Sequence, residues 1–458
     1  MKPVIASVWL VLIMVCVSLV GATTIRVDWA GSGDHTTIQQ GLNAAGAGDT
    51  VLVLAGTYTG AANRDLDFGG TNLVLLSQSG RALTVIDCET LGRGFLFDNC
   101  EDTTSVVSGF TITNAAADSG AGAFCVNGSN PIFEDCLFLE NTAQSRGGGL
   151  CCLSSSPRVR GCRFEGNTAD DGSADGYGGG IAYLTGSAPQ VHITEFIANE
   201  SRSSGAAIYA YYAPVLCVEC TFTGNNVLNY SAHGCGAALI FSDGATFTSC
   251  DFIENGTVEV SIGAGLNVDG CETTVTDCAF LRNRAGTGAG IYFTYASGST
   301  VSGCTFAGNV TEWGTGGGIS CMFGSDPTIT NCTFTDNEDY HIWCSDASPT
   351  IEYTILAFAS PGVPVYCAEG SETPHIHHCF VCANAGGDTL CGSTWHDIDT
   401  SDPLFCDREN EDFTLCANSP CLAGETWPQL VGAHGVGCPP CESATEPTSW
   451  GGIKALYR

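Results

Sequence analysis

Apolar and polar positions repeat along most of this chain with a period of about 22 to 32 residues. Each copy reads apolar-x-x-Cys-x-Phe-x-x-Asn, so the Cys and the Phe lie two positions apart. Positions two apart face the same side of an extended strand, and we therefore expect both side chains to point inward. The repeated residues are Cys136, Cys162, Cys220, Cys250, Cys278, Cys304, Cys332 and Cys379; Phe138, Phe164, Phe222, Phe252, Phe280, Phe306 and Phe334; and Asn141, Asn167, Asn225, Asn255, Asn283, Asn309 and Asn337. Weaker copies lie at Ser108/Phe110, Thr194/Phe196/Asn199, Thr354/Leu356 and Cys379/Val381.

A run of small residues that ends in an aliphatic residue precedes most copies. The runs are Gly147–Leu150, Gly178–Ile181, Gly205–Ile208, Gly236–Leu239, Gly263–Leu266, Gly288–Ile291 and Gly316–Ile319. Two positions after the aliphatic residue stand Cys152, Tyr183, Ala210, Phe241, Val268, Phe293 and Cys321. This alternation predicts a second short strand with these residues inward. It also predicts that Tyr209, Tyr211 and Tyr292 face outward.

Each repeat has room for short strands and tight turns but not for a helix. Stacking such coils gives a solenoid, and we predict an all-β, right-handed parallel β-helix with a rise of about 4.8 Å per coil. Like residues then stack in Cys, Phe and Asn ladders. We expect the Asn to sit at a bend in the left-handed conformation and to bond neighbouring coils. Glycine runs permit positive φ and close approach of coils.

The segment between each Asn and the next glycine run varies in length from copy to copy. In a solenoid such insertions fall on one face, which is often the binding face. We call these segments the variable loops.

These motifs resemble the repeats of the pectin-lyase-like superfamily, and the short motifs are similar to those of polymorphic outer-membrane adhesins. The stretches 37–45 and 48–58 resemble that superfamily's short N-terminal capping helix and first coil. The resemblance covers roughly residues 35–425. It implies a right-handed parallel β-helix, a fold that hosts lyases, hydrolases, esterases and non-catalytic surface proteins.

The chain divides into four predicted parts. Residues 1–22 are typical of a secretory signal peptide, with a retained membrane anchor as the competing interpretation. Residues 23–425 form the β-helix, with the N-terminal cap at about 35–60, the repeats at about 95–385 and a segment at about 386–425 that resembles the closing segment of secreted β-helix proteins and would cover the open edge of the last coil. Residues 426–441 form a Cys-containing segment. Residues 442–458 form a polar linker and a tail, and Trp450–Arg458 is either an attachment tag or disordered.

The whole chain has a formal net charge of −33 at pH 7, and Lys2 and Lys454 are its only lysines. Such a surface repels nucleic acids and anionic membranes, which excludes both as expected partners. After removal of the signal no apolar run is long enough to span a bilayer. We therefore expect a secreted or cell-surface protein.

The 27 cysteines pose a question of redox state, because export favours disulfides. Stacked strands place ladder Cβ atoms about 4.8 Å apart, farther than a disulfide prefers, so we expect the ladder cysteines to be reduced. Disulfides are expected among Cys382, Cys391, Cys406, Cys416, Cys421, Cys438 and Cys441. Cys438 and Cys441 have the spacing of a redox motif, but without its βαβ context a structural disulfide is expected.

Two segments have metal-ligand spacing. Asp170, Asp171, Ser173 and Asp175 match the start of a calcium loop, but Ala182 stands where that loop carries its Glu, and an ordinary turn is the alternative. The segment His375-x-His377-His378-Cys379-x-x-Cys382 has plausible zinc spacing. In the repeat register Cys379 points inward and the histidines outward, so solvated surface histidines are the alternative.

The sequence matches the catalytic motifs of such enzymes only in part. The resemblance implies, for a lyase, Ca²⁺ held by clustered Asp with an Arg or Lys base, and the candidate bases are Arg146, Arg158, Arg160 and Arg202. For a polygalacturonase-type hydrolase, the pair Asp170–Asp171 is a partial match, whereas Ala433-His434-Gly435 departs from the family's Gly-His-Gly.

Three functions follow as hypotheses. The first is a non-catalytic protein that binds glycan or a cell-surface partner through its variable loops. The second is a polysaccharide lyase or glycoside hydrolase acting on uronic-acid-type polysaccharides, and the third is a structural spacer. Aligned aromatic residues would favour binding, because sugars stack on exposed rings; the candidates are Tyr209, Tyr211, Tyr292 and Trp313, although isolated surface aromatics are normal. A carboxylate cluster with a nearby Arg would favour the enzyme.

Overall fold

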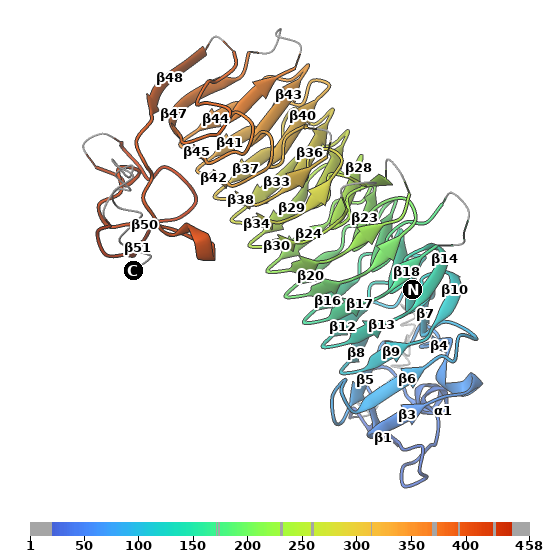
Figure 1. The fold of residues 1–458 in the computed structure, drawn as a ribbon. Helices are drawn as coiled ribbons and strands as arrows, with labels where there is room; N and C mark the ends of the chain where they lie inside the picture. Colours follow the sequence, from blue (N-terminus) through green and yellow to red (C-terminus); the bar gives the residue numbers. More distant parts are fainter. Residues whose placement is uncertain are drawn as a thin grey trace, which may run out of the picture.

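The computed structural model describes residues 21–441 except 171, 173–174, 230–231, 258–260, 313, 369–372, 393 and 425–426. These residues wind into a rod of stacked coils (Figure 1). Most of the predicted signal peptide, the calcium-loop residues Asp171 and Ser173, the loop residue Trp313 and the tail 442–458 lie outside the described residues. Within them, no helix is both long and apolar enough to cross a membrane.

The coils build three long parallel faces. The first face consists of β1 (Thr24–Val27), β2 (Thr50–Val53), β5 (Val74–Ser77), β8 (Val106–Ser108), β12 (Ile132–Glu134), β16 (Arg158–Arg160), β20 (Gln190–His192), β24 (Leu216–Val218), β29 (Ala245–Thr248), β33 (Thr273–Thr276), β37 (Thr300–Ser302), β41 (Thr328–Thr330), β44 (Thr350–Glu352), β47 (His375–Cys382) and β48 (Thr394–Asp399). The second face consists of β3 (Gly56–Tyr58), β6 (Thr84–Asp87), β9 (Thr111–Thr113), β13 (Leu137–Leu139), β17 (Arg163–Glu165), β21 (Glu195–Ile197), β25 (Thr221–Thr223), β30 (Asp251–Ile253), β34 (Ala279–Leu281), β38 (Thr305–Ala307), β42 (Thr333–Thr335) and β45 (Ile355–Ala357), which pairs with the end of β47.

The third face consists of β4 (Leu66–Asp67), β7 (Phe95–Phe97), β11 (Ala123–Cys125), β15 (Leu150–Leu153), β19 (Ile181–Leu184), β23 (Ile208–Tyr211), β28 (Ala237–Ile240), β32 (Leu266–Asp269), β36 (Ile291–Thr294), β40 (Ile319–Met322), β43 (Ile342–Ser345) and β46 (Val365–Cys367). Shorter strands lie in the segments between the Asn and the glycine run: β10 (Ala116–Ser119), β14 (Thr142–Arg146), β18 (Thr168–Ala169), β22 (Glu200–Ser201), β26 (Asn226–Val227), β27 (Ala232–His233), β31 (Ser261–Ile262), β35 (Arg284–Ala285) and β39 (Val310–Thr311).

Helix α1 (Ile38–Ala44) lies at the N-terminal end of the rod, as predicted for the cap (Figure 1). It buries Ile38 and Leu42. A Cβ on Gly41 would lie 2.6 Å from Cγ2 of Val27, so the helix packs closely on the first coil. The short 3₁₀ turns η1 (Ala61–Asn63) and η2 (Arg408–Asn410) are the other helical segments of the described chain.

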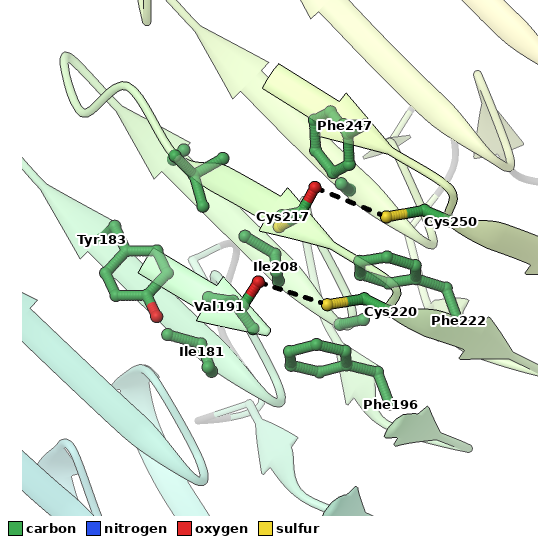
Figure 2. Packing of buried hydrophobic residues seen from close by; sticks show 14 of the residues in the cluster. Ile181, Tyr183, Val191, Phe196, Ile208, Cys217, Cys220, Phe222, Phe247 and Cys250 are labelled. Atoms are coloured by element: carbon green, nitrogen blue, oxygen red, sulfur yellow. Dashed lines mark hydrogen bonds between the residues drawn. The ribbon is translucent and has the colours of Figure 1, made fainter. Parts of the chain in front are cut away.

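The predicted Cys and Phe ladders form the core. Successive rings from Phe138 to Phe334, including Phe196 of a weaker copy, stack with centroids 4.5 to 5.2 Å apart. The ladder cysteines are buried and reduced. Their thiols donate to backbone oxygens of the preceding coil, as Cys220 does to Val191 at 3.5 Å and Cys250 to Cys217 at 3.6 Å (Figure 2).

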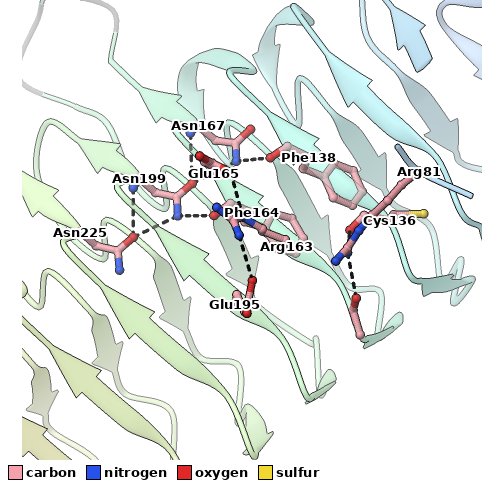
Figure 3. Close-up of polar contacts among 11 residues, drawn as sticks. Arg81, Cys136, Phe138, Arg163, Phe164, Glu165, Asn167, Glu195, Asn199 and Asn225 are labelled. Carbon is pink, nitrogen blue, oxygen red and sulfur yellow. Dashed lines mark hydrogen bonds and ion pairs between the residues drawn. The ribbon is translucent and has the colours of Figure 1, made fainter. Parts of the chain in front are cut away.

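The Asn ladder is buried and bonds neighbouring coils, as predicted. Asn199 shows the pattern, because its backbone N–H and its Nδ2 both donate to Oδ1 of Asn225 at 3.0 Å, and its Nδ2 also donates to the backbone oxygen of Phe164 at 2.9 Å (Figure 3). The predicted left-handed conformation of the Asn is wrong. The residue before it takes that conformation, for example Ala198 at φ 50° and Glu254 at φ 54°. The Asn therefore serves as a buried amide link between coils.

The register of one glycine run also differs from the prediction. Ala237, rather than Leu239, stacks on Ile208, and Leu239 stacks on Ala210. Phe241 was expected inward but follows the strand, with φ 50° and 43% of its surface exposed. A shift of two residues keeps the same strand face inward, so the apolar pattern tolerates both registers.

After β48 the chain turns back along the side of the rod and forms β49 (Phe405–Asp407), β50 (Asp412–Cys416) and β51 (Val436–Cys438) (Figure 1). Its contacts are with the flank: Trp427 packs on Phe380 with ring centroids 5.4 Å apart. Among the described residues, no strand pairs with the free edge of β48. Within the predicted closing segment, β48 thus pairs with the edge of β47, while the residues after β48 pack on the flank of the rod.

Three disulfides join Cys367 to Cys391, Cys406 to Cys438 and Cys416 to Cys441. Cys438 and Cys441 are both in structural disulfides, as expected, but each is joined to another strand of the C-terminal sheet and not to the other. Cys382 and Cys421 are buried free thiols, and Cys367 was not foreseen as a disulfide partner.

Candidate functional site

The calcium-loop residues that the structure describes are engaged with protein groups. Asp170 forms a 2.5 Å ion pair with Nε of Arg202 and accepts from the backbone N–H of Gly172 at 2.7 Å. Asp175 accepts from the Tyr177 hydroxyl at 3.2 Å. Calcium binding here stays a prediction, and it would compete with Arg202 for the Asp170 carboxylate.

The histidine and cysteine ligands predicted for zinc do not come together. Cys379 points into the core, where its thiol donates to the Ile351 oxygen at 3.7 Å and burial raises its pKa to about 12. Cys382 is buried near the C-terminal segment. His377 and His378 lie on the outside of the coil, so a His/Cys zinc site with this spacing is not formed.

The predicted outward tyrosines do not form an open platform. Tyr209 and Tyr292 are buried, and Tyr211 is half-buried. The ring of Tyr177, from a variable loop, packs on Tyr209 with centroids 4.7 Å apart. The variable loops therefore cover part of the outer side of the third face, which strand alternation alone cannot reveal.

A different set of aromatic residues is exposed, each directly after a third-face strand. Tyr212, Phe241, Tyr295 and Phe323 are 48%, 43%, 65% and 44% exposed. The preceding residues are register partners from coil to coil, with Gly270 at the middle position. We call these four residues the aromatic row. The rings of Tyr212 and Phe241 stack at 5.2 Å and those of Tyr295 and Phe323 at 5.5 Å.

The backbone of the aromatic row is unfavourable for its residues. All four residues have φ between 47° and 52°, a left-handed conformation that costs an L-residue other than Gly, Asn or Asp about 1–2 kcal/mol. Phe241 leans over Gly270, where an added Cβ would lie 2.5 Å from its ring. Large rings thus stand in strained positions while remaining exposed to solvent, which favours a role in binding.

A polar groove lies on the first face, on the outer side of β8, β12, β16 and β20. Its volume is about 390 Å³, and its charged and titratable lining residues are Glu134, Arg158, Arg160 and His192. Glu134, Arg160 and His192 are register partners on successive coils. Two arginines lie on one side of β16, in a chain with a net charge of −33. The groove can bind an anionic group, and Arg158 and Arg160 lie here and not beside the Asp170 loop.

Three cysteine sulfurs in the C-terminal sheet, Cys406, Cys416 and Cys438, lie within 4.8 Å of one another. All three are in disulfides, so they offer no thiolate for a metal ion.

A family model described as a right-handed β-helix region matches residues 63–252, 217–312 and 253–396. These matches cover more than half of the chain, which therefore belongs to this family. The predicted fold is confirmed, while the similarity to adhesins stays a prediction. No curated protein matches the chain at a significant level.

Several solved structures are similar to parts of this chain. A mannuronic acid specific family 6 polysaccharide lyase from human gut microbiota is 9% identical over 95% of this chain and 93% of its own, with a TM-score of 0.40. A periplasmic alginate epimerase is 10% identical over 64% of this chain and 76% of its own, with a TM-score of 0.32. The catalytic domain of a family 87 α-1,3-glucanase is 12% identical over 82% of this chain and 64% of its own, with a TM-score of 0.32. Likeness at this level supports no conclusion about this chain, and its fold rests on the family model and on its own structure.

The sequence contained a signal for the aromatic row, but the repeat pattern did not identify it. Tyr212, Phe241, Tyr295 and Phe323 are each followed, two to four residues later, by a turn residue such as Pro214. The repeat pattern assigned Phe241 to the core and assigned no place to Tyr212, Tyr295 and Phe323. The spacing of each ring from its glycine run was the available clue.

Proposed function

We propose that this chain is an extracellular or periplasmic β-helix protein that binds polysaccharide along the aromatic row. The observation that supports it is the row itself: four exposed rings at equivalent positions on coils of one rigid rod. Aromatic faces pack against the C–H faces of sugar rings, and a coil spacing of about 4.8 Å presents the rings in line along an extended glycan. The three disulfides and the predicted signal peptide support an oxidising compartment.

The row differs from the variable-loop face that the sequence suggested. The variable loops enter the third-face strands, whereas the aromatic row follows their ends. The rod places the rings without any moving part, so binding would need little ordering of the protein.

The double variant Tyr212→Asn/Phe241→Asn is expected to bind glycan about 30-fold more weakly, on the estimate of about 1 kcal/mol for each stacked ring. Asn tolerates the left-handed backbone, so the free energy of unfolding should stay level or rise. Affinity electrophoresis against neutral and uronic-acid polysaccharides measures binding, and thermal unfolding measures stability. Tyr295→Asn/Phe323→Asn tests the second ring pair.

A matched control is Leu91→Asn, which removes another side chain that is 67% exposed, far from the row. Its binding should equal that of the unaltered protein. Row variants that bind every polysaccharide of the panel normally, or an unaltered protein that binds none, would contradict the proposal.

The second candidate function is a lyase or hydrolase of uronic-acid-type polysaccharides. The groove at Glu134, Arg158, Arg160 and His192 favours it, because two guanidinium groups can bind carboxylates while a neighbouring side chain transfers a proton. Release of reducing or unsaturated ends, with and without Ca²⁺, tests it. Product release that Arg160→Ala abolishes and the row variants leave intact would place the function in the groove.

A further inference from the structure

The last three coils bring three histidines and two carboxylates together on the outside of the rod. β47 pairs with β44 on one side and β48 on the other, so that Glu352, His377 and His396 are register partners on three successive coils. The rings of His377 and His396 stack with centroids 5.3 Å apart and planes 9° from parallel.

A second column lies one residue further along each strand. Tyr353, His378 and Asp397 all have left-handed backbones, with φ 48°, 56° and 54°. The ring of His378 stacks on that of Tyr353 at 4.9 Å. Side chains from three coils are therefore held beside one another by the backbone.

The polar contacts link the two columns. Asp397 Oδ2 lies 2.8 Å from Nδ1 of His396 and 3.6 Å from Nε2 of His378. Nδ1 of His378 lies 2.9 Å from Nδ1 of His377, and Nε2 of His377 lies 3.7 Å from Oε2 of Glu352. One carboxylate oxygen thus lies between two imidazole nitrogens, with a third imidazole and a second carboxylate behind them.

This donor set has the chemistry of a transition-metal site. Zinc binds imidazole nitrogen and carboxylate oxygen at about 2.0–2.2 Å, so two ligands of a tetrahedral ion lie about 3.4 Å apart. The 3.6 Å separation between His378 and Asp397 fits that value. The donor atoms of His378, His396 and Asp397 do not all lie within 4.8 Å of one another in this structure. His396 therefore has to turn its ring to complete the set, and 64% of its side-chain surface is accessible, which leaves room for that turn.

The groups behind the donor set fit the role of orienting the ligands. If Nε2 of His378 binds the ion, its Nδ1 carries the proton and donates to Nδ1 of His377. His377 then holds its own proton on Nε2, which faces Glu352. A carboxylate–histidine chain of this kind fixes the tautomer of a metal-bound histidine.

Space for further ligands lies in front of the cluster. A cavity of about 530 Å³ is lined by His378, Asp397, Asp399 and Trp427, among others. Trp427 comes from the C-terminal segment and packs edge-on to His378 with centroids 6.0 Å apart. Three protein ligands and an open side leave positions on the ion for water or for an anionic ligand.

We propose that His378, His396 and Asp397 bind one divalent transition-metal ion of the Zn²⁺ class, with His377 and Glu352 orienting His378. This site is distinct from the calcium loop and from the aromatic row, and it does not depend on the polysaccharide function. His375, Cys379 and Cys382, which the sequence pattern placed in a zinc motif, are not part of it.

Calorimetric titration of the full chain with Zn²⁺ tests the site. We expect one ion to bind at pH 7.5 and the affinity to fall at least tenfold at pH 5.5, because protons compete with the ion for the imidazole nitrogens. His396→Ala/Asp397→Asn should lower the affinity at pH 7.5 at least tenfold. His375→Ala, on the same strand outside the site, should bind as the unaltered protein does.

Free thiols are the competing ligands, because the chain has many reduced cysteines. A second titration with Co²⁺ separates the two, since coordination by nitrogen and oxygen lacks the strong sulfur-to-cobalt charge-transfer band of thiolate ligands. Binding that persists in the double variant, a thiolate band, or no binding at all would each overturn the proposal. Circular dichroism of the double variant confirms its fold.

Discussion

Replacement of Asn225 by leucine is expected to lower the free energy of unfolding by about 5 kcal/mol, because several buried polar groups lose their partners at about 1–3 kcal/mol each. Asn225 is fully buried. Its Oδ1 accepts from the backbone and side chain of Asn199, and its Nδ2 donates to Phe196 at 3.0 Å and to Asn255 at 2.9 Å. Leucine has a similar size but restores none of these bonds.

The neighbouring residue offers a matched control. Asn226 has the same side chain, and its Oδ1 is buried without a hydrogen-bond partner. Asn226→Ala should therefore change stability little or raise it. Urea denaturation gives the global change, and hydrogen exchange shows whether the loss centres on the coils at 199, 225 and 255. Equal effects of the two substitutions would refute a special role for the ladder.

The repeat pattern predicted the fold because each anchor position carries one kind of side chain. The Phe at each anchor is large and apolar and repeats in step with the inward Cys, which favours the core, and the Asn that follows three positions later needs a partner on the next coil. Two independent constraints, ring stacking and amide bonding, then give the same register for every copy from Asn141 to Asn337. Agreement between local and long-range preferences is what makes such a prediction reliable.

Where the residues of a glycine run are all small, the repeat pattern could not decide the register of the strand that follows. The segment Gly234-Cys235-Gly236-Ala237-Ala238-Leu239 fits the glycine-run template in two registers that differ by two residues, and both keep the same face inward. The structure has the register that the sequence analysis did not choose, in which Ala237 pairs with Ile208 and Leu239 with Ala210. That choice moved Phe241 out of the core and into the aromatic row, so the error concealed a candidate binding residue.

The histidine cluster depended on pairings that no local pattern contains. β48 carries neither the Cys nor the Phe of the repeat, yet it pairs with β47 and places His396 and Asp397 beside His377 and His378. Cysteine pairing in the C-terminal sheet was undetermined for a similar reason, since spacing alone does not say which strands are adjacent. Site residues that come from different coils are visible only after the coils are stacked.

Between Asn337 and Asn384 one coil lacks the Asn of the ladder, and a histidine takes its place. The coil with β45 carries Ala359 at the ladder position. The backbone N–H of Ala359 donates to Oδ1 of Asn384 at 2.9 Å. His341 fills the gap: Nδ1 lies 3.1 Å from Nδ2 of Asn337, and Nε2 lies 2.9 Å from the backbone oxygen of Ala357. Since the Asn337 amide donates, His341 is neutral with its proton on Nε2.

This histidine makes the stability of the rod depend on pH. His341 is fully buried, and burial lowers its pKa from 6.5 to about 3. In the unfolded chain it takes up a proton near pH 6.5, whereas in the folded chain it does so only near pH 3. The unfolded state therefore binds more protons between these values, so the contribution to stability is complete above pH 6.5 and is lost as the pH falls.

At about 1.4 kcal/mol per pH unit, the folded protein should lose about 3 kcal/mol from this group between pH 7.5 and pH 4. His341→Gln keeps an acceptor and a donor but cannot titrate, so its loss of stability over the same interval should be smaller by that amount. Urea denaturation of both proteins at the two pH values isolates the effect, because His233, His377 and His434, whose pKa values burial also lowers, are common to both. His375→Gln, at an exposed position, should follow the unaltered protein, and a parallel pH dependence of His341→Gln would show that protonation of the buried ring does not limit the stability of the ladder.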